Sequence, residues 1–290
     1  MRNIIRIVSA QKINMGGIIL DQALPVAGID QIDPFLLIHH WRSTYKGGDD
    51  PLQIGVGPHP HRGFAPVTLI FEGGIHHRDS IGNSSVVMKG GTQWMNSGHG
   101  IIHSERPTVD IAKNGGVFEI IQFWVNAPST KKMDQPNYQP LSYEDTPKIV
   151  SPQKQVEIGL VAGDLADKKG RIDTYSPLRI LRVKSTGAEE NITLDIPRNF
   201  NALWYQLDGQ SKINGKVINA KDMVIFDNFD DTITFDALSE GNAIVLSGQP
   251  INEPVATYGP FVMNTQQEIV QAIQDYQSGK MGRLIETYDE

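Results

Sequence analysis

The sequence predicts an all-β protein of the antiparallel sandwich or barrel type, with a single helix near its C-terminus. Two stretches, 55–125 and 149–250, consist of short strand-like runs separated by turns that contain Gly. Strands at this spacing, with no long helical pattern between them, indicate antiparallel sheets. The only convincing helical pattern lies at 265–279. A chain of 290 residues is long enough for one large or two ordinary domains.

Short apolar runs broken by Gly and Pro fill residues 4–45 and are expected to form short strands. One of these runs ends at His39 and His40, which we interpret as a pair with a surface or packing role. The clearest pattern of strands and turns comes next, and the strands expected there are 65–71, 75–80, 85–88 and 117–125. Four prolines and little periodicity then predict a linker at 126–148.

An internal repeat relates the two β stretches. The segment 64–73 aligns without gaps with 200–209. In that register Asp195 stands in the place of His59, and Pro197 stands in the place of His61. The second stretch is therefore expected to keep a related β scaffold without the imidazoles.

The helix predicted at 265–279 begins with a capping-box pattern, Thr265 followed by Glu268 three residues later. Ile269, Ile273 and Tyr276 follow at helical spacing and predict an apolar stripe that packs on a β domain. Gly279 is well placed to end the helix.

Two short motifs supply metal-binding side chains in pairs, His59 with His61 and His103 with Glu105. Successive side chains of a strand point to opposite faces, so the two members of each pair point the same way. If two such strands lie side by side with these faces inward, three imidazoles and one carboxylate converge. All eight histidines lie between residues 39 and 103, which supports a site in this half of the chain.

This ligand set suits Fe(II), Mn(II), Ni(II), Cu(II) or Zn(II), and no thiolate competes because the chain has no Cys. Four protein ligands leave one or two positions open on an octahedral ion, as a catalytic or sensing site requires. His77 and Asp79 also share a strand face. We interpret them as a solvent-facing polar pair, the alternative being that Asp79 orients an imidazole behind the site.

Composition and charge argue against a nucleic-acid-binding protein and against a membrane-spanning one. A net charge of −7, with Lys and Arg scattered along the chain, argues against direct nucleic-acid binding, since that binding rests on phosphate neutralisation. No run approaches the roughly 18 apolar residues of a membrane span. The N-terminus lacks the apolar core of a signal peptide and the chain lacks Cys, so we expect a cytoplasmic protein that does not bind membranes.

Several motifs together resemble the pirin family of the cupin superfamily, from about residue 30 to the C-terminus and least clearly at 145–250. The matching segments are Pro58–Phe64, Asp79–Asn83, Gln93–Met95, Gly100–Glu105, Phe123–Asn126, Tyr138–Gln139 and Gly259–Thr265. Carried over residue by residue, the family's ligands are His59, His61, His103 and Glu105, the four that the spacing indicates. Many cupins instead take a Glu soon after the His-x-His pair, but Glu72 lies too far along the chain to match.

The resemblance implies a bicupin, with two stacked antiparallel β-barrels of the jelly-roll type and the metal in the N-terminal one. We therefore expect an N-terminal cupin domain at 1–135 that carries the metal site. A C-terminal cupin domain without metal ligands is expected at 136–255. The segment 256–290 is expected to contribute the helix at 265–279, packed on a barrel.

Proteins of the pirin type fall into two functional classes. Some resemble quercetin 2,3-dioxygenases, in which the metal holds a deprotonated flavonol beside O2 and the ring is cleaved with loss of CO. Others are iron-binding regulators that act through protein partners, with the oxidation state of the metal as the switch. We favour a dioxygenase that takes a small aromatic polyol such as quercetin together with O2, and keep the redox-responsive regulator as the alternative.

The expected cofactor is one divalent transition metal ion, Fe(II) before Ni, Cu, Zn, Mn or Co. Glu105 is expected to be a ligand and also the catalytic residue, as an acceptor of a proton from the substrate. An apolar wall is expected to exclude water from the site. Its candidate residues are Phe64, Met95, Phe118 and Phe123.

Overall fold

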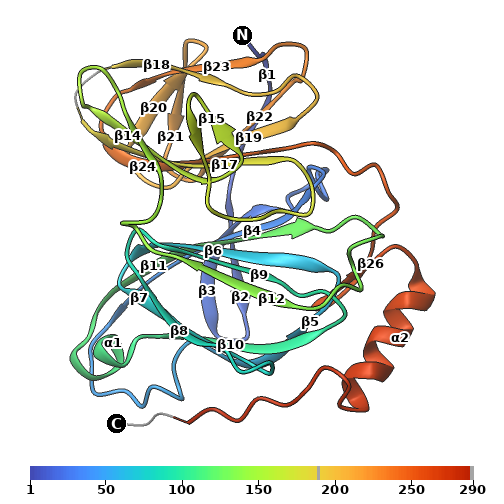
Figure 1. The fold of residues 1–290 in the computed structure, drawn as a ribbon. Coiled ribbons are helices and arrows are strands. Elements are labelled where there is room, and N and C mark those ends of the chain that lie inside the picture. The colour runs from blue at the N-terminus through green and yellow to red at the C-terminus, as the bar shows by residue number, and fades with distance from the viewer. Residues whose placement is uncertain (188–189, 288–290) are drawn as a thin grey trace. The chain divides into compact units, whose positions relative to one another are not determined.

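The structure is a computed structural model that describes residues 1–187 and 190–287 (Figure 1). The chain divides into two compact units built from antiparallel strands. Unit 1 comprises Met1–His40 and Glu144–Pro250, and unit 2 comprises Trp41–Tyr143 and Ile251–Glu290. Among the described residues, neither helix is long and apolar enough to cross a membrane.

Each unit draws on two separate segments of the chain, unlike the continuous segments expected from the sequence. The physical reason is strand pairing. Strand β1 (Ile4–Ser9) pairs with β22 (Asp222–Phe226), so the N-terminus completes a sheet formed by residues more than 200 positions away. The domain boundaries 1–135, 136–255 and 256–290 stay a prediction, and residues 288–290 lie outside the described residues.

Unit 2 contains a four-stranded sheet in the order β5-β10-β7-β8, the strands β12-β9-β6-β11 of a seven-stranded sheet in the order β12-β9-β6-β11-β4-β3-β2, and a small hairpin, β25-β26. Its strands are β5 (Val56–His61), β6 (Phe64–Glu72), β7 (Gly74–Asp79), β8 (Ser84–Met88), β9 (Thr92–Asn96), β10 (Ile101–Pro107), β11 (Gly116–Asn126), β12 (Asn137–Leu141), β25 (Ala256–Tyr258) and β26 (Phe261–Met263). The four strands predicted at 65–71, 75–80, 85–88 and 117–125 are β6, β7, β8 and β11.

Unit 1 contains a sheet in the order β1-β22-β19-β24-β17-β14-β13, a second in the order β18-β23-β20-β21, and the hairpin β15-β16. Strand β3 pairs with β2 and with the start of β4, which continues into unit 2. The remaining bounds are β2 (Gln11–Met15), β3 (Ile18–Leu24), β4 (Phe35–Tyr45), β13 (Lys148–Val150), β14 (Val156–Ala162), β15 (Asp164–Leu165), β16 (Lys168–Lys169), β17 (Leu178–Thr186), β18 (Asn191–Asp195), β19 (Asn201–Gln206), β20 (Gln210–Ile213), β21 (Lys216–Asn219), β23 (Thr232–Ala237) and β24 (Glu240–Gly248).

The two units repeat one topology. The order β5-β10-β7-β8 in unit 2 matches β18-β23-β20-β21 in unit 1, and β9-β6-β11 matches β22-β19-β24. The aligned segments 64–73 and 200–209 contain β6 and β19, which occupy the same place in the two orders. The predicted repeat of the scaffold is therefore confirmed.

The repeat also shows why unit 1 has no histidine cluster in this place. His59 pairs with His103 between β5 and β10, whereas Asp195 pairs with Thr232 between β18 and β23. The interior of unit 1 is a large apolar cluster that includes the fully buried Trp204. Apolar side chains fill this unit, because burying a polar group without partners is costly.

Two details of the secondary structure differ from the expectation. A second helix, α1 (Val109–Asn114), begins at its cap Thr108, and its six residues are too few to show helical periodicity in the sequence. The predicted linker 126–148 is not free of structure, because β12 lies in it and pairs with β9. Long-range pairing of this kind overrides the local signal of four prolines.

Helix α2 (Gln266–Gln277) has the predicted capping box, in which Thr265 and Glu268 satisfy each other's backbone N–H groups. Its buried face is rotated from the predicted stripe and consists of Ile269, Ala272 and Asp275, while Tyr276 is exposed. The apolar part packs with the β25-β26 hairpin, and the carboxylate of Asp275 faces a buried arginine described below.

Gly63, between β5 and β6, has a φ of +86° and approaches β26 so closely that a Cβ atom would meet the carbonyl oxygen of Val262. We expect Gly63→Ala to lower the free energy of unfolding by more than the roughly 1–2 kcal/mol of a left-handed alanine. The matched control is Gly82→Ala, at φ +99° with open space around it. Urea unfolding of the metal-free proteins measures both, and equal losses in the two variants would contradict the predicted clash.

Candidate metal centre

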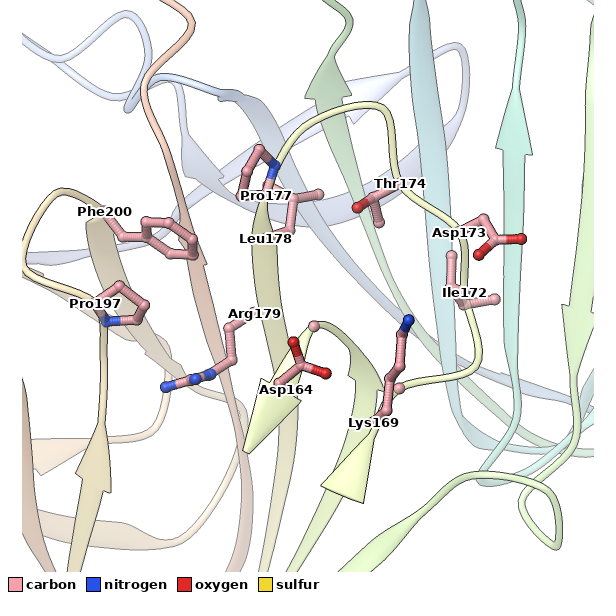
Figure 2. Close-up of a pocket in the computed structure, with 12 residues that line it drawn as sticks. Asp164, Lys169, Ile172, Asp173, Thr174, Pro177, Leu178, Arg179, Pro197 and Phe200 are labelled. Carbon is pink, nitrogen blue, oxygen red and sulfur yellow. The ribbon is translucent and has the colours of Figure 1, made fainter. Parts of the chain in front are cut away.

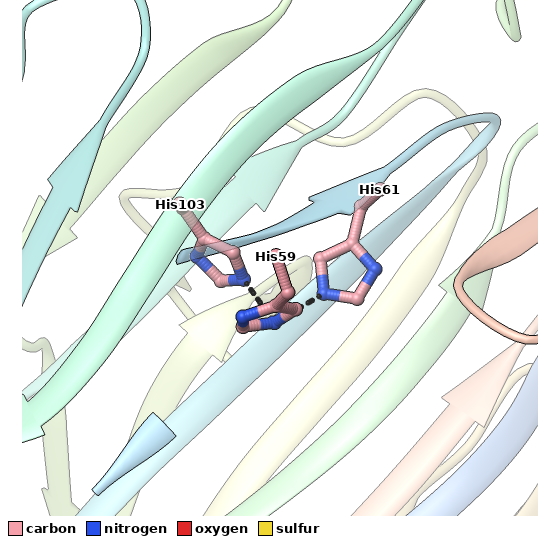
Figure 3. Close-up of side chains that lie close together, drawn as sticks. All are labelled: His59, His61 and His103. Carbon is pink, nitrogen blue, oxygen red and sulfur yellow. Dashed lines mark hydrogen bonds between the residues drawn. The ribbon is translucent and has the colours of Figure 1, made fainter. Parts of the chain in front are cut away.

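Strands β5 and β10 bring three histidines together in unit 2 (Figure 3). The Nε2 atom of His59 lies 3.0 Å from Nε2 of His61 and 3.0 Å from Nε2 of His103. One ligand atom from each ring lies within 4.8 Å of the other two. The described residues hold no second group of three or more such ligands at this spacing. The predicted meeting of the three imidazoles thus appears in the structure.

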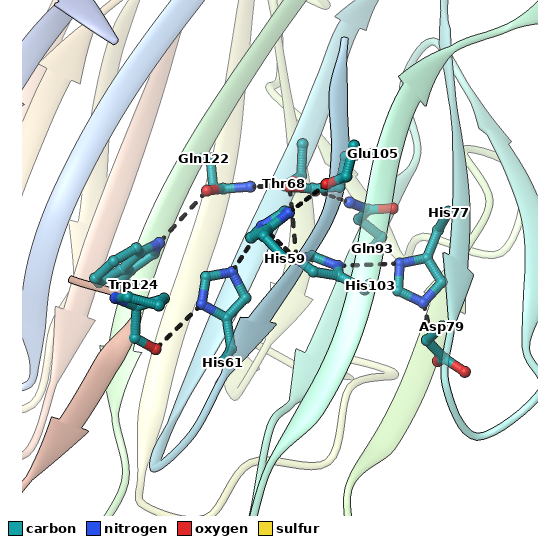
Figure 4. A network of polar contacts seen from close by, with 12 residues as sticks. His59, His61, Thr68, His77, Asp79, Gln93, His103, Glu105, Gln122 and Trp124 are labelled. Carbon is teal, nitrogen blue, oxygen red and sulfur yellow. Dashed lines mark hydrogen bonds and ion pairs between the residues drawn. The ribbon is translucent and has the colours of Figure 1, made fainter. Parts of the chain in front are cut away.

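Glu105 lies beside this cluster, with its Oε2 atom 3.9 Å from Nε2 of His103. Three side chains donate to its carboxylate (Figure 4). Oε1 accepts from Thr68 at 3.1 Å and from Gln93, and Oε2 accepts from Gln122 at 2.7 Å. Acceptance of three hydrogen bonds fits an ionised carboxylate, whose two oxygens offer about four lone-pair positions.

The Nδ1 atoms of His59 and His61 point away from the cluster toward backbone carbonyls. Nδ1 of His59 lies 2.8 Å from the carbonyl oxygen of Gly57, and Nδ1 of His61 lies 3.4 Å from that of Pro260. A carbonyl only accepts, so each Nδ1 is the protonated nitrogen and each Nε2 keeps its lone pair. The lone pairs of both rings therefore face the centre of the cluster.

Burial makes the pKa of both His61 and His103 fall well below its usual value, and the neighbouring imidazoles lower it further. The hydrogen bond from His61 to Pro260 opposes this shift only in part. Both rings are therefore neutral at neutral pH, the form in which imidazole binds a metal ion.

Hydrogen bonds connect the residues that follow β5 to the C-terminal segment 251–287 of unit 2. Arg62 donates from Nη1 to Asp275 of α2 at 2.9 Å and from Nε to the carbonyl of His99 at 2.6 Å. The buried Lys132 donates to the carbonyls of Gly63 and Val262. These contacts hold the carbonyl of Pro260 against His61, so residues from both ends of unit 2 define the position of one ring.

His77 and Asp79 correct the sequence interpretation, because both side chains are buried rather than facing solvent. Nε2 of His77 lies 3.0 Å from Oδ2 of Asp79, and its Nδ1 lies 3.4 Å from Nδ1 of His103. Burial raises the pKa of Asp79, but hydrogen bonds from His77 and Asn83 outweigh this and keep it below its ordinary value. The pair stands directly behind the cluster.

The other four histidines bond elsewhere. His40 is fully buried and has the packing role expected of it, with Nδ1 3.1 Å from the hydroxyl of Tyr205. The remaining contacts are His39 with Gln22, His76 with Ser84 and His99 with Gln135.

Aromatic side chains close one side of the cluster. The ring of Phe64 lies 5.1 Å from that of His61 and 4.3 Å from that of Trp124, between centroids. Phe64 was expected in the wall. Phe118, also expected there, packs instead on Trp41 at 4.9 Å. Trp124 was not predicted, since nothing in the strand pattern separates it from ordinary core.

Unit 1 has a cavity of about 330 Å³ near β15 and β17, but its lining lacks histidine (Figure 2). Lys169 and Arg179 share it with the carboxylates of Asp164 and Asp173, so the charged side chains balance. Arg179 donates to the backbone carbonyl of Asp195. Among the described residues of this lining, no three metal-ligating side chains lie close together.

Comparison with known proteins shows the family to which this chain belongs. The model of the pirin family matches residues 18–125, and the model of the pirin C-terminal cupin domain matches residues 184–282. The protein is thus a cupin with two domains, a bicupin. More particularly, the chain belongs to the pirin family.

Individual relatives cover nearly the whole chain. A Pseudomonas aeruginosa protein named as a putative quercetin 2,3-dioxygenase is 36% identical over 256 residues, or 87% of each chain. Pirin-like protein 2 of Arabidopsis thaliana is 36% identical over 87% of this chain and 76% of its own. The crystal structure of quercetin 2,3-dioxygenase from Acinetobacter baumannii matches with a TM-score of 0.90 at 34% identity, covering 98% of this chain and 100% of that one.

The depressed pKa values of His61 and His103 predict a loss of stability in mild acid when metal is absent. The unfolded chain takes up protons near pH 6.5, where the folded rings stay neutral, so the free energy of unfolding falls as pH drops below about 6.5. Each such histidine contributes up to about 1.4 kcal/mol per pH unit. Urea midpoints measured with a chelator at pH 7.5, 6.5 and 5.5 test this, and His103→Gln should show a shallower decline. A midpoint that is constant from pH 7.5 to 5.5 would contradict the prediction.

Proposed function

We propose that the chain binds one divalent transition metal ion through His59, His61, His103 and Glu105. The observation that carries the proposal is the convergence of three imidazoles, each with one ring nitrogen within 4.8 Å of the other two, and with Nε2 of His59 3.0 Å from Nε2 of both His61 and His103. For His59 and His61 the hydrogen bonds at Nδ1 leave the Nε2 lone pair facing inward. Three neutral imidazoles and one carboxylate form a donor set that suits a first-row ion.

Glu105 fits the role of fourth ligand. Its Oε1 is engaged by Thr68 and Gln93, whereas Oε2, the atom nearer His103, accepts only from Gln122 in the interactions described above. Oε2 therefore retains a lone pair on the side of the cluster. We propose Fe(II) as the ion, while Ni, Cu, Zn, Mn and Co accept the same donors.

The proposed activity is oxygen-dependent cleavage of a small aromatic polyol of the flavonol type. Support comes from the family and from relatives named for quercetin 2,3-dioxygenase activity. A bound divalent ion supplies Lewis acidity that lowers the pKa of a substrate hydroxyl group. Phe64 and Trp124 form an aromatic side of the site that restricts water near His61. Glu105 accepts the proton that the hydroxyl group loses once its Oε2 atom leaves the ion on substrate binding, because the other lone pairs of the carboxylate are already engaged.

Removal of any one of the three imidazoles is expected to weaken metal binding more than about 100-fold, beyond the 10–100-fold typical of removing an outer partner. The variants are His59→Ala, His61→Ala and His103→Ala. The control is His99→Ala, whose ring bonds Gln135 outside the cluster. Metal content after dialysis against a weak chelator gives the stoichiometry. One ion per chain retained by all three cluster variants would refute the site.

Fe(II)-loaded protein, prepared without oxygen, is expected to consume O2 when quercetin is added. Uptake should rise in proportion to bound iron and fall at least about 100-fold in Glu105→Gln, since a positioned base contributes at least that factor. An oxygen electrode measures the rate, with His99→Ala as the matched control. Firmly bound iron without oxygen uptake would contradict the dioxygenase and favour the redox-responsive regulator.

A further inference from the structure

A second pair of buried side chains stands behind His103 on the side away from His59. The contacts run in a line from the Nδ1 atom of His103 to Nδ1 of His77 at 3.4 Å, and from Nε2 of His77 to Oδ2 of Asp79 at 3.0 Å (Figure 4). The exposed fractions of His103, His77 and Asp79 are 1%, 1% and 4%. Water therefore has little access to substitute for any of these partners.

The carboxylate of Asp79 accepts hydrogen bonds from every partner described. Its Oδ1 accepts from the backbone N–H groups of Ile81 at 3.1 Å and Asn83 at 2.9 Å, and its Oδ2 accepts from the side-chain amide of Asn83 at 2.7 Å. The turn between β7 and β8 creates this nest, as Asp commonly does by bonding backbone N–H groups a few residues ahead. A carboxylate held in this way only accepts, so the proton of its contact with His77 belongs to His77 Nε2.

The directions of the remaining bonds follow. One nitrogen of a neutral imidazole donates and the other accepts, so the neutral form of His77 that is protonated at Nε2 accepts at Nδ1. The proton of the next contact then lies on Nδ1 of His103. The lone pair of His103 is left on Nε2, the atom that lies 3.0 Å from Nε2 of His59.

We propose that Asp79 and His77 are positioning residues that select the tautomer and orientation in which Nε2 of His103 binds the metal. This inference rests on the proposed metal site. Backbone carbonyls set the tautomers of His59 and His61 by accepting from their Nδ1 atoms. For His103 the same role falls to the side chain of His77, which is itself bonded to the carboxylate of Asp79. Such an outer partner also makes the ligand a stronger base.

The fold holds this pair rigidly. Strand β7 runs antiparallel to β10, with Asp79 opposite His103 and His77 opposite Glu105. The ring of His77 stacks on that of Tyr138, with centroids 3.9 Å apart and an angle of 3° between planes. A ring fixed between Tyr138 and Asp79 presents one nitrogen to His103 in one direction.

The test compares His77→Phe with His77→Gln in the full chain. Phenylalanine keeps a ring to stack on Tyr138 but offers no acceptor, whereas glutamine offers a carbonyl oxygen that accepts from His103. Ni²⁺ alone is the probe, with its Kd measured by competition against a chelator. His77→Phe is expected to weaken binding about 10–100-fold, as loss of an outer partner does, and His77→Gln is expected to recover part of the loss.

Three further proteins complete the experiment. Asp79→Asn, whose amide can donate to His77 and so permit the reversed order of protons, is expected to weaken binding in the same direction. His76→Phe changes the neighbouring half-buried histidine, which contacts Ser84, and should bind like the wild type. His103→Ala tests the site itself. Thermal unfolding of each metal-free variant establishes that it folds.

NMR of the metal-free protein labelled with ¹⁵N at histidine gives a readout that general packing would not move. The couplings between ring nitrogens and carbon-bound ring protons are expected to assign the proton of His103 to Nδ1 in the wild type and to a mixture in His77→Phe. Wild-type Ni²⁺ affinity and an unchanged tautomer in His77→Phe would overturn the inference. Equal Ni²⁺ binding by wild type and His103→Ala would instead overturn the proposed metal site.

Discussion

The hydrogen bond at each Nδ1 atom is the constraint on which the site depends. An imidazole has two nitrogens, and the one that gives up its proton is decided by the partner of the other. His59 meets the carbonyl of Gly57, His61 meets that of Pro260, and His103 meets His77. Each partner lies on the side of its imidazole that is turned away from the cluster, so the Nε2 lone pairs of the three rings point inward. Without these partners the same three rings could turn or hold protons on the wrong atoms.

Those partners come from distant parts of the chain, which ties the site to the stability of unit 2 as a whole. The ion pair of Arg62 with Asp275 joins the end of β5 to the C-terminal segment, and so do the hydrogen bonds of the buried Lys132 to the carbonyls of Gly63 and Val262. Buried charges of this kind are costly unless paired, and loss of one partner usually costs several kcal/mol. The C-terminal helix thus supports His61, one of the proposed metal ligands, which lies more than 200 residues before it in the sequence.

The two units have the same strand order but different side chains in their interiors. Both have the same strand order, yet β5 and β10 carry imidazoles and a carboxylate where β18 and β23 carry Asp195, Thr232 and apolar neighbours. In unit 1 the interior is filled by side chains such as Trp204 and Phe235, whose rings lie 4.7 Å apart. In unit 2 the interior near β10 is polar, and every oxygen of Glu105 has a donor. The packing of the interior, rather than the topology, separates the two.

The sequence by itself determined the class of fold, the strands β6, β7, β8 and β11, the capping box of α2 and the pairing of His59 with His61 on one strand face. These features depend on local patterns, since alternation along a strand sets the face of His59 and His61, whereas the approach of His103 also requires that β10 pair with β5. The sequence did not determine which unit the N-terminus joins, because β1 pairs with a strand that only the folded chain brings near it. Nor could it show that His77 and Asp79 are buried, or that Gln93, Gln122 and Thr68 surround Glu105. Burial and hydrogen-bond partners across strands are set by pairing and packing between distant segments, and only the tertiary structure decides them.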